Sequence, residues 1–195
     1  MKLFPGISVL SSVKSDEEWM VRLKANQREA FDALYEKYKR PIMSYIYSMT
    51  RDQNLSEDLT QETFLKLYRT RESYVASAKF STFLWTIAKH TTFDHLAKKK
   101  ELLHAQSDAF GEPLESKDES PGADELMIRE IEESKVRECL ERLSPRAKHI
   151  VALRIFSEET YSEISKITSE TEGTVKTILH RSKASLVECF KRRSK

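Results

Sequence analysis

Two helix signals separated by a short turn, between Thr160 and Phe190, constrain the fold of this chain more than any other stretch. Thr160 precedes Glu163 by the spacing of an N-terminal capping box, and Ser169 precedes Glu172 in the same way. The first signal begins a helix of about two turns, and the second begins a longer helix. A short helix, a tight turn around Ser169 and a long helix together predict a helix-turn-helix.

The long helix has two unlike faces. One is an apolar stripe suited to packing on a core, made of Val175, Ile178, Leu179, Leu186 and Phe190. The opposite face carries cations and hydroxyls, with no carboxylate between Lys176 and Lys183. A solvated face usually mixes both signs, so this one favours a polyanion such as DNA, although an ordinary basic surface near a chain end remains the alternative. The candidate DNA contacts are Thr174, Lys176, Thr177, His180, Arg181 and Lys183.

A further helix is predicted to begin upstream, at Ser144 and Pro145. Serine is preferred at the N-cap and proline at the first helical position. Its apolar residues follow at helical spacing. Residues 128–195 are therefore expected to form a compact four-helix module with one basic exposed helix.

The N-terminal half also has helical periodicity. Ser15 and Glu18 mark a capped start, and Asn54 with Glu57 has the spacing of a second capping box. Between them lies a long apolar stripe, in which Pro41 is expected to kink or restart the helix. No segment sustains the alternation of a strand, so the predicted fold class is all-α.

Charge is distributed unevenly along the chain. It has 33 Lys and Arg against 31 Asp and Glu, but residues 101–127 alone hold eight acids and one lysine. This stretch has few large apolar residues, which predicts a flexible linker that could extend to roughly 80 Å. The expected organisation is a flexible extension over 1–14, a helical domain over 15–100, the acidic linker over 101–127 and the helix-turn-helix domain over 128–195.

Two cysteines, Cys139 and Cys189, lie far apart in the sequence and lack the close spacing of a metal site. We expect two reduced, partly buried thiols in a cytoplasmic protein. No apolar run approaches the roughly 18 residues of a membrane span, and Pro5 and Gly6 interrupt the short apolar part of the N-terminus. We expect no cofactor, no metal and no catalytic residue.

The segment 80–100 combines aromatic side chains with lysines, a composition that suits unstacked nucleotides. The alternative is that the aromatics are core residues and the lysines a solvated helix end. We favour the core for Phe83 and Phe93, whereas Trp85 and the loop 73–79 remain candidates for contact with a separated strand.

Three carboxylates, those of Glu57, Asp58 and Glu62, lie close together on one predicted helix. They could indicate a metal-dependent hydrolase, but no histidine or nucleophile–base pair accompanies them. An acidic first turn is the ordinary explanation, and an acidic, partly apolar face also suits docking onto a basic protein surface.

Five blocks of the chain together resemble the bacterial RNA polymerase sigma factors of the sigma-70 family, extracytoplasmic-function branch. In chain order they are AFDALYEKYKRPIMSYI, SEDLTQETFLKLY, FSTFLWTIAKHTTFDHLAKKK, LSPRAKHIVALR and YSEISKITSETEGTVKTILHRSKASL. The resemblance implies a non-enzymatic subunit that binds core RNA polymerase, reads a duplex −35 promoter element and opens the −10 element. It also implies an anti-sigma protein as a partner, which could hold the chain at the membrane.

The resemblance also assigns residues to each task. Polymerase docking falls to Asp58, Leu59, Gln61, Glu62, Phe64 and Leu65. Contact with the −10 element falls to Tyr74, Lys79, Trp85, Lys89, His90, Asp94, Lys98, Lys99 and Lys100. Contact with the −35 element is assigned to Arg154 and to the six candidate residues of the long helix. The chain departs from the family pattern at Phe83, His90 and Ile178, so the promoter sequence does not transfer.

The same residues leave a second hypothesis open. A stand-alone transcriptional regulator, with an N-terminal sensor or dimerisation domain, would explain the helix-turn-helix equally well but would leave the segment 80–100 without a task. Core polymerase discriminates the two, because such a regulator binds its site without it.

Overall fold

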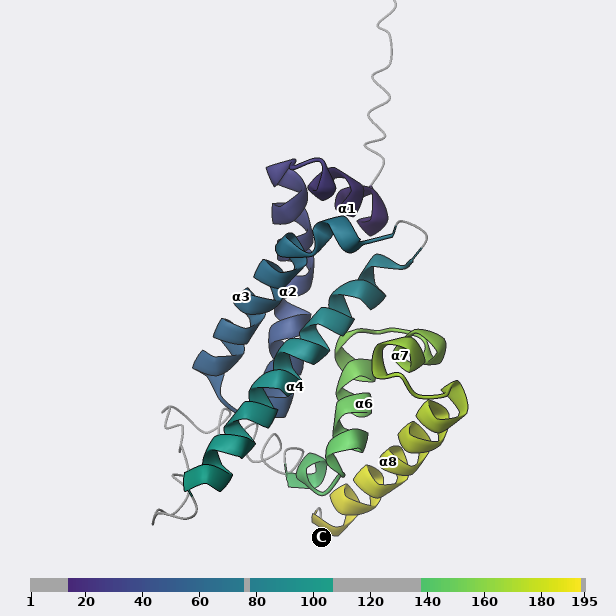
Figure 1. Cartoon of the computed structure of the whole chain (residues 1–195). Helices are drawn as coiled ribbons and strands as arrows, with labels where there is room; N and C mark the ends of the chain where they lie inside the picture. The colour runs from purple at the N-terminus through teal and green to yellow at the C-terminus, as the bar shows by residue number, and fades with distance from the viewer. Residues whose placement is uncertain (1–13, 76–77, 107–137, 194–195) are drawn as a thin grey trace, which may run out of the picture.

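The computed structural model describes residues 14–75, 78–106 and 138–193, and every regular element in these ranges is a helix. The helices are α1 (Asp16–Lys24), α2 (Arg28–Thr50), α3 (Gln53–Arg69), the 3-10 turn η1 (Arg71–Ser73), α4 (Phe80–Gln106), α6 (Pro145–Phe156), α7 (Tyr161–Thr168) and α8 (Glu172–Arg193). The predicted all-α fold with two helical domains is confirmed (Figure 1).

The first domain is built from α1 to α4. The long α2 packs against α1, α3 and α4, and α3 packs against α4 (Figure 1). The predicted capping box at the start of α1 is confirmed, because Ser15 Oγ accepts from Glu18 N and the Glu18 carboxylate accepts from Ser15 N. This pairing satisfies two amide groups that a helix start leaves open.

Helix α2 does not restart at Pro41 but continues from Arg28 to Thr50, and Tyr38 and Ile42 beside the proline are buried in the core. The predicted kink at Pro41 stays a prediction. The expected cap of the next helix is wrong. Helix α3 is capped by Asp52, whose carboxylate accepts from Leu55 N, and the predicted cap Asn54 lies inside the first turn.

The second domain contains α6, α7 and α8, preceded by a helical turn at 138–141. Ser144 caps α6 with Pro145 at its first position, and Thr160 caps α7, as predicted. Ser169 ends α7 in the left-handed region at φ 60°, which makes the tight turn of the helix-turn-helix. Its predicted role as the cap of α8 is wrong.

Helix α8 is capped by Thr171. Its Oγ1 accepts from Thr174 N, at 3.2 Å, and its carbonyl accepts from Val175 N.

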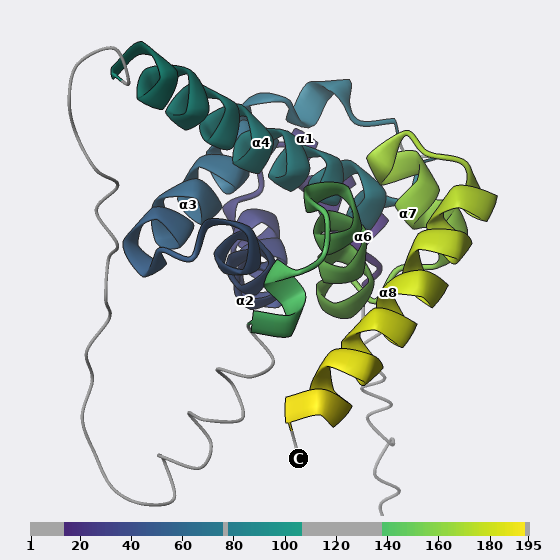
Figure 2. The same ribbon diagram turned by 90° about the horizontal axis from the view of Figure 1, so that it is seen from below.

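The two domains share one hydrophobic core. Helix α6 packs against α2, and α7 packs against α4, so the helix-turn-helix lies alongside the first domain (Figure 2). Leu153 of α6, with Ile164 and Ile167 of α7, belongs to the same buried apolar cluster as Leu84 and Ala88 of α4. The two parts of the chain therefore form one packed body in this structure.

The cysteines form a disulfide, so the expectation of two free thiols is wrong. Cys139 and Cys189 have their Cα atoms 5.8 Å apart and are bonded. The bond ties the helical turn at 138–141 to the end of α8, and the 50-residue separation between the two cysteines concealed this proximity in the sequence.

Helix α4 runs past the predicted domain boundary at Lys100 and ends at Gln106. The rest of the predicted linker, the stretch 107–127, lies outside the described residues, as does almost all of the predicted N-terminal extension 1–14. None of the described helices is long and apolar enough to cross a bilayer.

Candidate nucleic-acid interface

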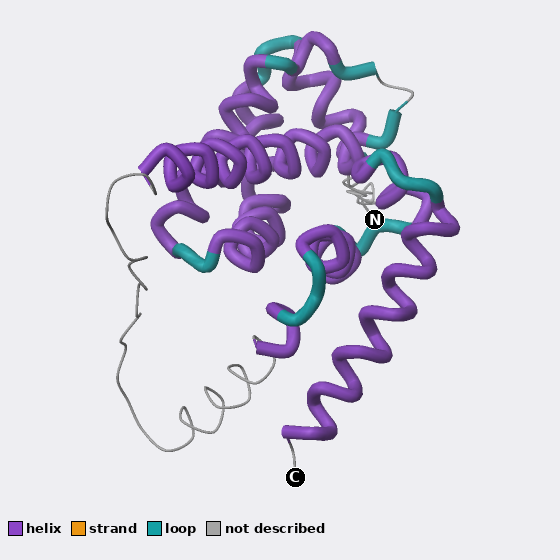
Figure 3. The backbone as a smooth tube through the Cα atoms, turned by 60° about the horizontal axis from the view of Figure 1, so that its bottom comes forward, coloured by secondary structure: helices purple, strands orange, loops and turns teal. Residues whose placement is uncertain are grey.

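Helix α8 lies along one edge of the molecule (Figure 3). Its Val175 and Ser182 are buried, as the helical period requires. The predicted DNA contacts Lys176, Thr177, His180, Arg181 and Lys183 are all exposed. A hydrogen bond to Glu172, one turn earlier, raises the pKa of Lys176 and keeps it cationic. An exposed second helix of this kind can enter a major groove.

Two other predicted −35 contacts have structural partners. Thr174 is half-buried, and its hydroxyl lies 2.8 Å from that of Thr171 at the helix cap. The guanidinium of Arg154 donates to the Glu159 carbonyl at 2.7 Å and lies 5.5 Å from the ring centroid of Tyr161. Arg154 is exposed, and its contact with DNA stays a prediction.

The −10 candidates divide into three groups along α4 and the loop before it. Five of them are exposed near or beyond the middle of α4, namely His90, Asp94, Lys98, Lys99 and Lys100. Their contact with DNA stays a prediction.

The second group is buried, which corrects two candidates. Trp85 is 1% exposed and packs edge-to-face against Tyr45, with 5.5 Å between ring centroids. Tyr74 is 3% exposed, and its hydroxyl donates to the carbonyl of Ala78. Neither ring can stack on a base without leaving the core. Phe83 and Phe93, which the sequence assigned to the core, are half-buried.

The third group faces the second domain. Lys79 Nζ lies 2.5 Å from the Glu159 carboxylate, and Lys89 Nζ donates to the Ile167 carbonyl at 2.9 Å. Between them the Thr82 hydroxyl donates to the Glu163 carboxylate. All three acceptors lie between the end of α6 and the end of α7. Local sequence patterns do not predict these contacts, because each joins residues about 80 positions apart.

The Glu163 carboxylate is held in its charged form. Hydrogen bonds from Lys166 and then Thr82 lower its pKa, and burial opposes them only in part. The Lys166 bond measures 2.8 Å and lies within α7, whereas the Thr82 bond crosses between the domains. Glu163 therefore presents a negative charge to α4.

Helix α3 carries the predicted polymerase-docking residues on the side of the molecule away from α8 (Figures 1 and 2). Asp58, Gln61, Glu62 and Leu65 are exposed. Leu59 and Phe64 are 3% and 1% exposed, so they are core residues and do not face a partner. They lie on the inner side of the helix because they follow its 3.6-residue apolar period.

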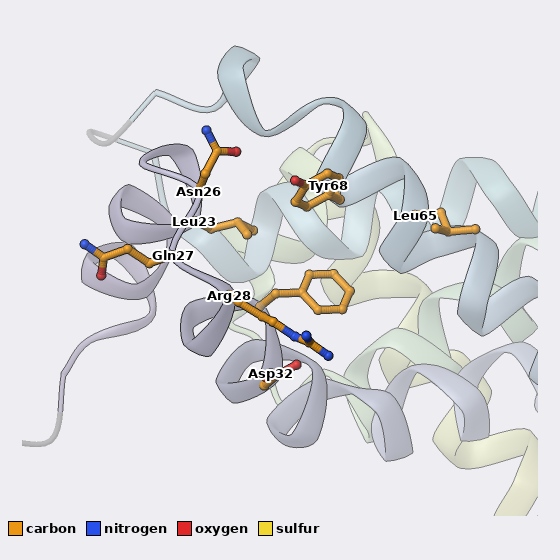
Figure 4. A pocket seen from close by; sticks show the side chains of 8 residues that line it. Leu23, Asn26, Gln27, Arg28, Asp32, Leu65 and Tyr68 are labelled. Carbon is orange, nitrogen blue, oxygen red and sulfur yellow. The ribbon is translucent and has the colours of Figure 1, made fainter.

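A pocket of about 410 Å³ opens where α3 ends beside the turn between α1 and α2. Leu65 and Tyr68 line one side, and Asn26, Arg28 and Asp32 lie across from them (Figure 4). Leu65 is 52% exposed and Tyr68 42% exposed, so both side chains offer apolar surface at the pocket. Sequence reasoning missed Tyr68, although its position three residues after Leu65 places both on one face.

The carboxylates of Glu57, Asp58 and Glu62 do not converge on a metal position. Among the residues that the structure describes, no group of three or more His, Cys, Asp or Glu could hold a metal ion. Glu62 instead pairs with Lys66 at 2.9 Å, and Glu57 accepts from Gln53 at 2.8 Å. The hydrolase hypothesis therefore has no site on α3.

Two family models match the chain. Sigma-70 region 2 covers residues 34–101, and the model described as Sigma-70, region 4, covers residues 133–186. The first match spans α2 to α4, and the second spans the helix-turn-helix.

Curated relatives match across most of the chain. The extracytoplasmic-function sigma factor SigM of Bacillus subtilis is 29% identical, with 83% of this chain and 95% of that protein covered. The corresponding factor BldN of Streptomyces coelicolor is 26% identical over 84% of this chain. The chain spans 61% of the length of BldN.

Two solved structures have the same fold. The structure of CnrH in complex with the cytosolic domain of CnrY has a TM-score of 0.69 at 13% identity, covering 92% of this chain and 99% of that one. The sigma factor RpoE in complex with the anti-sigma factor NepR from Bartonella quintana has a TM-score of 0.66 at 19% identity, covering 83% and 96%.

Proposed function

The chain belongs to the extracytoplasmic-function branch of the sigma-70 family of RNA polymerase sigma factors, and on that premise we propose how it directs polymerase to promoters. Helix α8 reads the −35 element as duplex, α4 holds the −10 element, and α3 docks on core polymerase. The protein is an initiation factor with no chemistry of its own.

The exposed face of α8 is the observation that carries this proposal. Lys176, His180 and Arg181 project from the second helix of a helix-turn-helix, with no carboxylate among them. Side chains of these types bind phosphates and reach base edges in the major groove. Binding to the −35 element should therefore weaken steeply as salt concentration rises.

The first domain supplies the other two tasks. The exposed cations Lys98, Lys99 and Lys100 lie on the distal half of α4, where they can hold the phosphates of the −10 region. On α3, the exposed Glu62 and Asp58 lie one and two turns before the apolar Leu65, on the same face of the helix. A mixed acidic and apolar face of this kind complements a basic protein surface.

Two further features belong to this proposal. The protein works in the cytoplasm, where polymerase and DNA are found, and an anti-sigma protein restrains it. The CnrH and RpoE structures are each complexes with a second protein, and NepR is described as an anti-sigma factor.

Two measurements test the proposal together. The purified chain should co-elute with core polymerase and support run-off transcription from a subset of genomic fragments. The variants Lys176→Ala and Arg181→Ala should co-elute normally but lose that selection. Normal transcription by both variants would show that α8 does not read the promoter, and binding of DNA without any need for core polymerase would favour a stand-alone regulator.

A further inference from the structure

The ring of Tyr161 lies close to two of the predicted −35 contacts. The guanidinium carbon of Arg154, in the last turn of α6, is 5.5 Å from the ring centroid, and the ammonium nitrogen of Lys176 on α8 is 5.9 Å from it. Tyr161 itself is the first residue of α7, directly after the cap Thr160. One aromatic side chain therefore links α6, α7 and α8, which pack on one another (Figure 1).

The exposure of Tyr161 shows that its ring is not a core residue. Ile164, three residues later on the same side of α7, is 0% exposed, whereas Tyr161 is 38% exposed. The face of an aromatic ring carries negative charge and attracts Lys and Arg side chains within about 6 Å of its centroid. Arg154 and Lys176 both meet that distance.

A neutral ring restrains a cation without cancelling its charge. Lys176 also pairs with the Glu172 carboxylate at 2.7 Å, but that carboxylate is an anion and competes with a DNA phosphate for the lysine. The ring of Tyr161 carries no net charge, and neither does the Glu159 carbonyl that accepts from Arg154 at 2.7 Å. The ring therefore limits the motion of both side chains and leaves their charge available to phosphates.

We propose that Tyr161 is a positioning residue for the −35 element, whose ring holds Arg154 and Lys176 in the orientations in which they bind the duplex. The inference rests on the proposed function, since it assigns Tyr161 a task at that same site. Ordering a long side chain at an interface lowers affinity, and a ring that orders it before binding removes part of that cost. The hydroxyl of Tyr161 has no part in this role.

The stacking is tested first in the full chain without DNA. Nuclear Overhauser spectra should connect the ring protons of Tyr161 with side-chain protons of Arg154 and of Lys176, and Lys176→Ala identifies the lysine signals. Absence of either connection would overturn the proposal. This measurement needs neither polymerase nor promoter, so its outcome does not depend on the proposed function.

Promoter binding by the holoenzyme distinguishes the ring from the hydroxyl. Tyr161→Leu removes the ring and should weaken binding to a promoter fragment, selected by run-off transcription, about fivefold. Tyr161→Phe keeps the ring and should restore binding to within about twofold of wild type. An equal loss in both variants would show that the hydroxyl contacts the DNA directly and would overturn the positioning role. Circular dichroism shows whether the variants fold, and if Tyr161→Leu does not, the spectra of wild type decide alone.

The matched control is Trp19→Leu on α1. The ring of Trp19 also lies near two cations, with Lys14 at 4.6 Å and Arg22 at 5.6 Å, and it belongs to none of the proposed contacts with DNA or polymerase. Holoenzyme with this variant should bind the promoter as wild type does. An equal loss in Trp19→Leu and Tyr161→Leu would overturn the proposal.

The ring should act only through the two cations. In the variant Arg154→Ala/Lys176→Ala, measured at low salt where other phosphate contacts persist, Tyr161→Leu should cause no further loss of promoter binding. A further loss of similar size would show that the ring contacts DNA by itself and would overturn the proposal. Normal binding by Tyr161→Leu, with promoter selection lost in Lys176→Ala, would retain the proposed function and remove the positioning role. Unchanged selection in both Lys176→Ala and Arg181→Ala would instead remove the proposed function.

Discussion

The hydroxyl of Tyr45 lies 2.9 Å from Nδ1 of His149, and this buried pair joins α2 to α6 across 104 residues. Burial raises the pKa of Tyr45, so its hydroxyl stays protonated and can donate to the ring. Phe93 of α4 packs edge-to-face on the imidazole, with 4.9 Å between centroids. The packing of the two domains therefore depends on the protonation of His149.

Acid should weaken the packed state through His149. Burial, and then the nearby charge of Lys89, lower the pKa of His149 from 6.5 to about 4. Between pH 6.5 and 4, His149 binds a proton in the unfolded chain but not in the folded chain. The stability that this histidine contributes is therefore complete above pH 6.5 and is lost as the pH falls towards 4. The free energy of unfolding should fall by about 3 kcal/mol over this range.

Urea unfolding at several pH values checks this prediction against His149→Gln, which keeps a hydrogen-bonding side chain but does not titrate. The free energy of unfolding of the variant should fall less than that of wild type between pH 6.5 and 4. Parallel pH profiles for the two proteins would show that His149 does not carry the effect.

Reduction should destabilise the second domain. The bond between Cys139 and Cys189 closes a loop of about 50 residues, and loops of that size restrict the unfolded chain enough to contribute about 2–4 kcal/mol. Dithiothreitol should lower the urea midpoint of wild type and leave Cys139→Ser/Cys189→Ser unaffected. Detection of two free thiols in the untreated folded protein would contradict the bond.

The turn of the helix-turn-helix should be improved by glycine. Ser169 adopts φ 60°, a conformation that costs a residue with a side chain roughly 1–2 kcal/mol. Ser169→Gly should therefore raise the free energy of unfolding by about 0.5–1 kcal/mol, after the greater freedom of glycine in the unfolded chain is deducted. Ser165→Gly, in the middle of α7, should instead lower it by about 0.5 kcal/mol. If both substitutions destabilised equally, the turn would not have this geometry.

The pocket at the end of α3 should contribute to polymerase binding. Leu65→Glu places a charge on an exposed apolar side chain and should weaken binding to core polymerase about tenfold, without loss of stability. Val187→Glu makes the same change at an exposed position on α8 and serves as the control. Fluorescence anisotropy with labelled protein measures the affinity of each variant for core polymerase. Equal affinities of the Leu65→Glu and Val187→Glu variants would show that α3 does not form part of the docking surface.

The features that follow helical periodicity could be predicted from the sequence. The basic face of α8 and the cap at Ser144 depend only on residues within one or two helical turns, so the local sequence is enough to predict them. The sequence leaves Trp85 a candidate for both the core and the DNA, because aromatic residues beside lysines suit both a core and a stacking surface. Only the position of Tyr45, on another helix, decides between them.

The remaining errors come from contacts between distant residues. Asp52 and Asn54 are both good capping residues, and the choice depends on α2 ending in the left-handed conformation at Arg51. The disulfide and the contacts of Glu159 and Glu163 join residues 50 to about 80 positions apart, for which local patterns give no signal.

The central claim is that α8 reads the duplex −35 element while the first domain holds the −10 element on core polymerase. Footprinting on one promoter fragment, selected by run-off transcription, tests this claim most directly. With core polymerase, wild type should protect an upstream duplex segment and make thymines near the start site reactive to permanganate. Lys176→Ala/Arg181→Ala should lose both while still binding polymerase. Protection of the same segment by the chain alone, with no reactive thymines when polymerase is added, would contradict the account.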